Sequence, residues 1–496
     1  LSPDNPLIFM TGPLTGNTAF SFKTAVTSQS PLTGGLGKSI FSGSWGASLK
    51  KAGFDGIVIT GASSNPVHIV IEDENIEIRD ATSLWGLETT ETFKNIKESL
   101  GDGFSTVAIG PAGEKLVRIA CIVSHEMRFA GRTGLGAVMG SKKLKAISVK
   151  GTKKLEVSDP ESLRKYGAEW LKKATQSPRG QAFHEYGTPA GVAAGHDSGN
   201  LPMKHWTAGH WPDAYNLGGQ VYMEKYKLGP GWKQCGDGVV CSIGCERQIQ
   251  YNDPRFGEYK GKGPEYETVA MLGSHLLVGD PVAVAAMDNM CGKLGIDTIS
   301  TGEVLAWFTE AFEKNILNKE ETGGIVPKWG DYDTYMKLIK LIAYREGIGD
   351  LLAEGVKRAS EKINKGSENF AVHVKGLEVP AHNPRLYNSL GLQYATSNRG
   401  ACHLQGMSML VERGIFLPEY GIEAPPKTSE EKVNVVITHQ NLCNFLDSAV
   451  LCKFAVFGIT DFNLLTNLWN SVTGMNWTKD DIWRLGDRVW YLERIV

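Results

Sequence analysis

The sequence has little of several features that would define its class quickly. Only eight cysteines occur in 496 residues, which is too few for a disulfide-stabilised scaffold. No stretch approaches the ~20 consecutive apolar residues of a membrane-spanning helix, so no span is predicted. The formal net charge of −2 comes from 52 basic and 54 acidic residues. This balance argues against a general nucleic-acid binder, which needs a basic face.

The chain also lacks an initiating methionine and a charged-then-apolar leader before its first apolar segment, LSPDNPLIF at 1–9. We interpret it as a fragment whose own N-terminus is missing, which leaves a removed signal peptide open. Hydrophobic residues make up 42% and charged residues 21%, as in an ordinary globular protein. The length allows two to four domains at roughly 100–200 residues each.

Short apolar runs alternate with turn signals through the first 150 residues. Helical patterns are few there, and 88–101 is the clearest of them. From about residue 156 the pattern becomes helical, beginning where Ser158 or Asp159 precedes Pro160 as a cap. Further helices are predicted over 332–347, closed by Gly347, and through 350–363.

These patterns predict an α+β multidomain protein. Residues 1–155 form a β-rich domain without the strand–helix alternation of a doubly wound sheet. Residues 156–371 form a mostly helical domain that contains a group of cysteines. An extended joint at 370–384 leads into a second mostly helical domain, 372–496.

Three cysteines, Cys235, Cys241 and Cys245, fall within eleven residues with the spacing C-x5-C-x3-C. Thiolates suit iron–sulfur clusters and zinc, and the glycines among them let backbone amides turn toward inorganic sulfide. Three buried thiols without a metal are the plain alternative. Zinc is another, although structural zinc sites usually show paired C-x2-C spacings. A cluster needs a fourth ligand, which spacing alone does not identify.

Two glycine-rich strings suggest nucleotide binding but lack the required spacing. In SPLTGGLGKS (30–39), Leu32 stands where a P-loop needs glycine, and GRTGLGAVMG (131–140) lacks the Rossmann spacing. Neither string supports an ATPase or a nicotinamide enzyme.

Longer strings resemble the aldehyde ferredoxin oxidoreductase family, and they occur in family order along almost the whole chain. They are NPLIFMTGPLTGN (5–17), SPLTG (30–34), DATSLWGLETTET (80–92), IGPAGE (109–114), AGRTGLGAVMGSKKLKAISVKG (130–151), GPEYET (263–268), LGIDTIST (294–301), NRGACH (398–403) and LDSAVLC (446–452). The family's usual first and last segments are not found in this sequence.

The resemblance implies a β-rich base domain and two helical domains around two pterin-dithiolene ligands that hold tungsten or molybdenum. It also implies a nearby [4Fe–4S] cluster, and magnesium between the pterin phosphates as a further cofactor. Cys241, Cys245 and Cys452 match family cluster ligands. Cys235 is displaced, because the family spacing places the first ligand at Gly238. We expect a three-residue insertion to let Cys235 reach the iron; a three-cysteine cluster or a non-protein ligand is the alternative.

For catalysis, the resemblance points to Glu267 in GPEYET and His403 in NRGACH, beside the metal. A carboxylate can take the proton of an attacking water, and an imidazole can hold a carbonyl oxygen. A buried ion pair and a satisfied core histidine are the plain alternatives. Glu265 is a lesser candidate for the same role as Glu267.

Six further positions are implied to bind the pterins: Lys23, Arg132, Asp297, Asp447, Leu451 and Gln405. Arg132 and Lys23 match basic positions near the phosphates. The carboxylates of Asp297 and Asp447 can accept hydrogen bonds from pterin N–H groups. Cys452 would contact both the pterin and the cluster.

Several positions depart from the family pattern: Gly292 for an Asp, Val450 for a Gly, Gln405 for a Lys and Ile40 for a magnesium-associated Asn. Ala286 and Asn289 replace a Glu-x-x-His pattern that holds iron between subunits in some members. That iron, and the dimer it supports, are therefore not predicted. Cys402 and Cys443 are candidates to approach the metal, but we favour small buried hydrophobes for both.

Together, these observations predict a cytoplasmic, anaerobic-type oxidoreductase that converts an aldehyde to a carboxylic acid. Electrons would leave through the cluster to ferredoxin or an iron–sulfur partner subunit. Two alternatives stay open: low-potential reduction of an aromatic acyl-CoA thioester with the same cofactors, and a non-catalytic iron–sulfur electron-transfer protein. The prediction requires Cys452 near Cys241 and Cys245, and a cavity bordered by Glu267 and His403.

Overall fold

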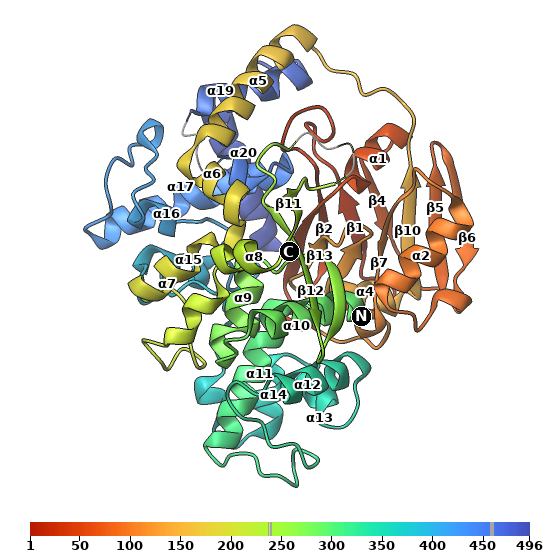
Figure 1. Cartoon of the computed structure of the whole chain (residues 1–496). Helices are drawn as coiled ribbons and strands as arrows, with labels where there is room; N and C mark the ends of the chain where they lie inside the picture. Colours follow the sequence, from red (N-terminus) through yellow and green to blue (C-terminus); the bar gives the residue numbers. More distant parts are fainter. Residues whose placement is uncertain (237, 239–240, 457–460) are drawn as a thin grey trace.

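Two sheets form the N-terminal part of the computed structural model, which describes residues 1–236, 238, 241–456 and 461–496 (Figure 1). The first sheet is antiparallel, with strand order β3-β2-β1-β4. Its strands are β1 (Leu7–Met10), β2 (Lys23–Gln29), β3 (Leu36–Ser42) and β4 (Gly56–Ile59).

The second sheet has the strand order β6-β5-β10-β7-β8-β9. β10 pairs in parallel with β5, and the other described pairs are antiparallel. Its strands are β5 (Val67–Glu72), β6 (Asn75–Asp80), β7 (Ser105–Ala108), β8 (Ile122–Ser124), β9 (Phe129–Ala130) and β10 (Leu144–Lys150).

Apolar side chains from both sheets share one core with the helices α1 (Trp45–Ala52) and α4 (Leu135–Ser141). The Trp45 ring lies 5.3 Å from that of Phe9, and its Nε1 donates to the Ile147 carbonyl at 3.1 Å. Burying a large apolar side chain stabilises the folded state by roughly 1.5–3 kcal/mol. This core therefore holds the two sheets rigidly beside the site. The helix predicted at 88–101 is confirmed as α2 (Thr89–Leu100).

The chain from residue 160 is mostly helical, and several helices begin at an aspartate whose carboxylate accepts backbone N–H groups. Such caps stabilise a helix by about 1 kcal/mol. The helices of this middle part are α5 (Pro160–Gln176), α6 (Pro178–Tyr186), α7 (Val192–Ser198), α8 (Gly219–Lys225), α9 (Tyr266–Leu272), α10 (Pro281–Leu294), α11 (Thr298–Glu313), α12 (Tyr332–Tyr344), α13 (Ile348–Leu352) and α14 (Val356–Ile363). α11 is buried along most of its length in the largest core.

The structure corrects three local predictions in this part. A three-stranded antiparallel sheet, β11 (Lys227–Lys233), β12 (Glu246–Asp253) and β13 (Gly257–Lys262), lies within the region predicted as helical. α12 ends at Arg345 in the left-handed conformation, not at Gly347. The helix predicted through 350–363 is broken, because Gly355 has a φ of +83° between α13 and α14.

The last part of the chain combines a short hairpin with helices that pack on one another and on α5. The extended stretch predicted at 370–384 contains β14 (His373–Val374) and β15 (Leu377–Glu378). The helices are α15 (Asn388–Thr396), α16 (Met409–Glu412), α17 (Ser429–Ser448), α18 (Lys453–Val456), α19 (Phe462–Thr473) and α20 (Lys479–Ile495). α17 and α20 lie side by side, and α19 packs on α5 (Figure 1).

The predicted fold class, a β-rich N-terminal part followed by mostly helical parts, is confirmed. The boundaries at 155/156 and 371/372 stay predictions. Among the described helices, none alone has the length and hydropathy of a membrane span. One bent pair, Tyr266–Leu276 with Pro281–Leu294, meets those two criteria together.

Candidate active site

A cavity of about 670 Å³ lies where the β-rich part meets the two helical parts. This volume is within the range of cofactor and ligand pockets, about 300–1,000 Å³. Every site residue predicted from the sequence lines it except Cys241: Lys23, Arg132, Cys235, Cys245, Glu267, Asp297, His403, Gln405, Asp447, Leu451 and Cys452. The cavity bordered by Glu267 and His403 therefore exists.

Glu267 lies in the first turn of α9, with its carboxylate facing two imidazoles. Its Oε2 accepts a hydrogen bond from the Ala381 N–H at 2.8 Å. Its Oε1 lies 3.4 Å from His403 Nδ1 and 3.5 Å from His382 Nε2, and has no hydrogen-bond partner in the described chain. Burial raises the pKa of Glu267 to about 7, despite the opposing effects of the Ala381 N–H and Arg132.

The neighbours of His382 determine which of its two ring nitrogens carries the proton. The Asn383 N–H donates to Asn200 Oδ1 at 3.1 Å, which fixes the orientation of the Asn200 amide. Asn200 Nδ2 then donates to His382 Nδ1 at 3.1 Å, so the proton of neutral His382 sits on Nε2, facing Glu267. Burial lowers the pKa of His382 to about 3, and the Tyr266 ring stacks on it at 5.1 Å.

His403 is a second neutral imidazole at the same carboxylate. Burial, with the nearby His382 and Arg132, lowers the pKa of His403 well below its usual value. Its Nδ1 is buried without a hydrogen-bond partner among the described residues. The site thus combines a carboxylate that titrates near neutrality with two uncharged imidazoles, a set suited to moving one proton.

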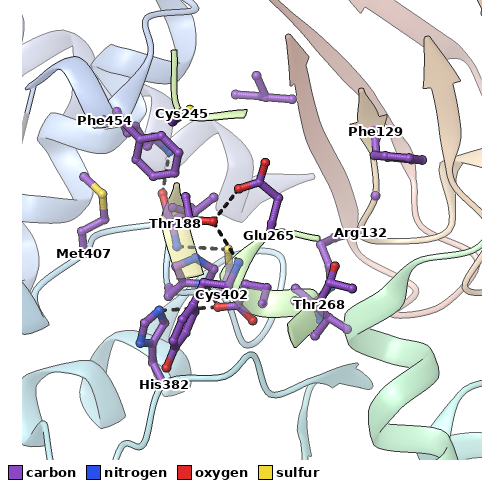
Figure 2. A pocket seen from close by; sticks show the side chains of 18 of the residues that line it. Phe129, Arg132, Thr188, Cys245, Glu265, Thr268, His382, Cys402, Met407 and Phe454 are labelled. Atoms are coloured by element: carbon purple, nitrogen blue, oxygen red, sulfur yellow. Dashed lines mark hydrogen bonds and ion pairs between the residues drawn. The ribbon is translucent and has the colours of Figure 1, made fainter. Parts of the chain in front are cut away.

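Sequence reasoning did not find His382, Asn200 or Tyr266. The sequence signal for His382 is the histidine of VPAHNP, within the stretch that the sequence pattern predicts as an extended joint. In the structure, that segment passes directly beside α9, because Tyr266 Oη donates to the Ala381 carbonyl at 3.1 Å. Figure 2 shows His382 and Cys402 toward one end of the pocket, with Cys245 and Phe454 at the other.

The four predicted cluster cysteines come together at that other end. Cys235 Sγ lies 3.9 Å from Cys241 Sγ. All four contribute to one core, and burial together with Cys235 and Cys452 raises the pKa of Cys245. The predicted proximity of Cys452 to the other cysteines is therefore found, and Cys235 lies among them despite its displaced spacing.

Two glycines in the loop that carries these cysteines lie close against neighbouring residues. A Cβ on Gly236 would lie 2.5 Å from a Glu126 oxygen and 2.9 Å from Gly43 Cα. A Cβ on Gly244, which has a φ of +53°, would lie 2.6 Å from the Trp232 ring. Both positions therefore require glycine for the loop to approach its neighbours closely.

Lys23, the first residue of β2, lines the cavity close to the thiols. Burial lowers its pKa, but Cys452, Cys235 and Asp447 raise it further, so the net shift is upward. A buried ammonium group beside several thiols favours their ionised form. The structure thus places Lys23 at the cysteines as well as at the cavity.

Arg132 and Asp297 face each other across the cavity wall. Arg132 Nε lies 3.2 Å from Asp297 Oδ2, and Arg132 Nη2 donates to the Glu378 carbonyl at 2.6 Å. Asp297 also caps α11, because its Oδ2 accepts from the Ser300 N–H at 2.9 Å. Part of the hydrogen-bonding capacity of Asp297 is thus used by its own helix.

Asp447 is the centre of a buried charge network. Its Oδ1 lies 2.7 Å from Lys453 Nζ and its Oδ2 3.3 Å from Lys38 Nζ. Gln405 Nε2 donates to Oδ2 at 3.1 Å. Burial raises the pKa of Asp447, but the two lysines lower it more, so the carboxylate stays charged. With two lysines already present, a neutral Gln405 adds a hydrogen bond to Asp447 without adding a third positive charge.

Two positions that depart from the family pattern, Val450 and Gly292, differ in their local surroundings. Val450 has a φ of +50°, a conformation that glycine adopts freely and a β-branched residue rarely does. A Cβ at Gly292 would lie 2.9 Å from Met127 and 3.3 Å from the Phe129 ring, so these side chains occupy the space beside Gly292. Phe129 gives this part of the cavity an apolar wall.

Cys402 is not the simple buried hydrophobe that we favoured. Arg399 Nη2 donates to its Sγ, and the Leu404 N–H donates at 3.3 Å. Burial raises the pKa of Cys402, but Arg399 and Arg132 lower it further, so the net pKa lies below its usual value. Cys443 instead packs among Met407 and Leu410.

Three parts of the chain close over one charged cavity, and comparison with known proteins identifies the class to which this chain belongs. Two family models match it. Aldehyde ferredoxin oxidoreductase, N-terminal domain, matches residues 1–151, and aldehyde ferredoxin oxidoreductase, domains 2 and 3, matches residues 165–496. The chain belongs to the aldehyde ferredoxin oxidoreductase family, as the sequence resemblance predicted.

Individual relatives match this chain over its whole length. The tungsten-containing aldehyde ferredoxin oxidoreductase of Pyrococcus furiosus is 39% identical, and the match covers 80% of that relative. The protein of the same name from Thermococcus kodakarensis is 38% identical, also over 80% of its length. A subunit named aliphatic sulfonate oxidoreductase, WOR-like subunit, from Pyrococcus furiosus is 33% identical over 77% of its length.

A solved structure shares the fold. The active site complex BamBC of benzoyl coenzyme A reductase, in complex with 1,5-dienoyl-CoA, has a TM-score of 0.83 and 23% sequence identity. The match covers 100% of this chain and 82% of that chain.

Proposed function

We propose that this protein oxidises an aldehyde to a carboxylic acid, using a tungsten bis-pterin in the cavity and a [4Fe–4S] cluster at Cys235, Cys241, Cys245 and Cys452. The observation that carries the proposal is the position of Glu267. Its carboxylate titrates near pH 7 and turns an oxygen without a hydrogen-bond partner in the described chain toward two neutral imidazoles at the cavity wall.

The residues present fit a large anionic cofactor. Lys23 and Arg132 offer cationic groups to phosphates, and the Nε atom of Arg399 is buried without a hydrogen-bond acceptor among the described residues. Asp297, Asp447, Leu451 and Gln405 would contact the pterin rings. Ile40 gives the cavity an apolar side chain, so a magnesium ion between the phosphates would need oxygen ligands from other groups.

The cysteines fit a cluster. Four thiols converge from two distant segments, Gly236 and Gly244 allow their loop to lie close, and Lys23 and Arg128 provide positive charge beside them. The cluster and a tungsten bis-pterin would accept the two electrons released when an aldehyde and water become a carboxylic acid and two protons. Ferredoxin, or an iron–sulfur partner subunit, would then receive the electrons.

The chain's own residues would handle water and protons. Glu267 Oε1 takes a proton from the water that adds to the carbonyl carbon, while the Ala381 N–H holds Oε2 in place. The Nε2–H of His382 faces Oε1 at 3.5 Å, and Asn200 maintains this tautomer. His403 holds the carbonyl oxygen of the substrate. Phe129, Leu410 and other apolar wall residues exclude bulk water.

The test uses the full chain, purified anaerobically after growth with tungstate. Its reduction of a viologen dye is measured with a panel of aldehydes, and in parallel with a low-potential donor and an aromatic acyl-CoA. Aldehyde-dependent dye reduction supports the proposal. Activity with the thioester alone supports the alternative reductase, and iron without tungsten or either activity supports a non-catalytic electron carrier.

Glu265→Gln is the comparator for Glu267→Gln. Glu265 lines the same cavity, but its Oε2 accepts the Thr188 hydroxyl at 2.5 Å and takes no part in the pairing with the two imidazoles. If Glu265→Gln lowers the rate more than Glu267→Gln does, the assignment of the base is wrong.

A further inference from the structure

A second group of ligand-type side chains lies outside the cavity, formed by His205, His275 and Glu303. Their donor atoms lie within 4.8 Å of one another, and all three side chains are at most 1% exposed. Glu303 lies within α11, and His275 lies in the 3₁₀ turn Ser274–Leu276 that follows α9. Three separate segments of the chain therefore bring these side chains together in the protein interior.

The carboxylate of Glu303 presents one oxygen to each imidazole. Its Oε1 lies 2.8 Å from His205 Nε2, and its Oε2 lies 2.9 Å from His275 Nε2. Two ligand atoms that are each about 2.1 Å from a metal ion, at right angles, are about 3 Å apart. Each oxygen–nitrogen separation therefore matches two ligands of one ion, and the three residues can offer it a carboxylate and two imidazole nitrogens.

The outer partner of His205 is the kind that metal-binding histidines use. Its Nδ1 makes a short hydrogen bond to Glu310 Oε2, and Lys314 Nζ lies 2.7 Å from the other oxygen of Glu310. A carboxylate that accepts from Nδ1–H leaves the Nε2 lone pair free for a metal, fixes the ring and increases its basicity.

The backbone around His205 is unusual as well. Lys204, His205 and Trp206 have φ values of +44°, +48° and +64°, all in the left-handed region. Three consecutive residues other than glycine adopt this conformation only where their surroundings impose it, and such strain is concentrated at functional sites. The His205 N–H donates to the His275 carbonyl at 3.1 Å, so this backbone conformation holds His205 beside His275.

We infer that His205, His275 and Glu303 bind one divalent transition-metal ion, with Glu310 as the outer-sphere partner of His205. A site of two imidazoles and a carboxylate suits zinc or ferrous iron. The ion would be structural, because the residues that hold it do not line the cavity. It would also be separate from the tungsten and the cluster proposed above.

The position of this ion would matter for the active site. His205 follows Asn200 by five residues, and His275 follows the helix that carries Glu267. The Val372 N–H donates to Glu303 Oε1 at 3.3 Å, at the start of the segment that leads to His382. One ion would thus hold together the three segments that position the catalytic carboxylate and its relay.

The rival explanation is a metal-free charge network, in which a protonated His205 lies between the carboxylates of Glu303 and Glu310. It accounts for the same short contacts but predicts no bound ion. Metal content distinguishes the two explanations directly.

The test is elemental analysis of the anaerobically purified full chain, wild type against His275→Gln, with tungsten, iron, zinc, manganese, cobalt and nickel counted per chain. We expect wild type to hold one equivalent of a first-row metal that His275→Gln loses, with tungsten unchanged. His439→Gln, which alters a buried histidine on α17, is the matched control and should keep the ion.

A second variant distinguishes the loss of a metal ligand from a failure of the chain to fold. Glu310→Gln keeps all three ligands and should bind the ion about 10–100-fold more weakly, as measured by competition with a chelator. Equal metal content in wild type and His275→Gln would overturn the inference. So would a wild-type chain whose first-row metals amount only to the iron of its cluster, because this result matches the metal-free network.

Discussion

The Nε2 atom of His382 lies 3.5 Å from Oε1 of Glu267, so an imidazole from the segment after β15 faces a carboxylate from α9. Because Asn200 donates to Nδ1 of the same ring, the proton of His382 is directed at Glu267. This relationship gives the site a defined direction for proton movement, and two predictions follow from it.

Glu267→Gln should lower kcat for aldehyde oxidation by about 10²–10⁴-fold, the usual contribution of a general base. In wild type, kcat/KM should rise as the pH increases through about 7, because burial raises the pKa of Glu267 and only its carboxylate form accepts a proton. The measurement is the pH–rate profile. A wild-type rate that is flat between pH 5.5 and 8.5 would contradict the role of Glu267.

His382→Phe should move the acidic limb of that profile to higher pH. The phenyl ring can keep the stacking on Tyr266, but it removes the N–H dipole that faces Glu267 Oε1 at 3.5 Å, so we expect the pKa of Glu267 to increase. We expect a shift of about one unit, with a roughly tenfold loss of rate at pH 6.5. Asn200→Leu should shift the profile in the same direction, because it releases the tautomer. An unchanged profile in both variants would leave His382 with a packing role only.

Cys452→Ser and Cys241→Ala should each lose most of the cluster iron, measured per chain together with the visible absorbance of the cluster. Cys291→Ala is the control, because Cys291 is buried in α10 away from these thiols. Cys235→Ser tests the displaced ligand. Loss of iron comparable to that in Cys452→Ser supports four cysteine ligands, whereas full retention of iron and absorbance supports a three-cysteine cluster.

Lys145→Met should lower the melting temperature, because it breaks a buried pair. Lys145 Nζ lies 2.5 Å from Glu114 Oε1 and donates to the Leu87 carbonyl at 2.8 Å, and neither charged group reaches solvent appreciably. Leaving Glu114 without its partner should cost about 3–5 kcal/mol. The double variant Lys145→Met, Glu114→Leu should recover much of this loss. A double variant no more stable than the single one would show that the lysine stabilises chiefly through Leu87.

The sequence predicted the outline of this fold because its signals are local. The capping aspartate at Asp159 and the periodic stripe of α12 are properties of neighbouring residues, and both are found. β11 and β13 were missed because their glycines and lysines give no apolar alternation. The break at Gly355 depends on a positive φ that composition does not reveal.

The residues of the site also fall into two groups, those that sequence motifs identify and those that depend on the three-dimensional arrangement. Family motifs located Glu267, His403 and the cysteines, but motif order carries no distances. His382 could not be assigned from VPAHNP, because its role depends on the Asn200 amide and on the orientation of one ring. The roles of the pterin-binding residues, and the domain boundaries, stay predictions.

Lys38 in β3 and Glu493 in α20 form a buried ion pair with a separation of 2.6 Å, and Lys38 also lies beside Asp447 at the cavity. Strand β3, early in the chain, and helix α20, late in the chain, therefore contribute charges to the same buried network. A ribosome releases α20 only after every other described element has emerged. The native charge pairing of this cavity wall therefore cannot form before α20 has been synthesised, and a cofactor that needs this wall can be held only after that point.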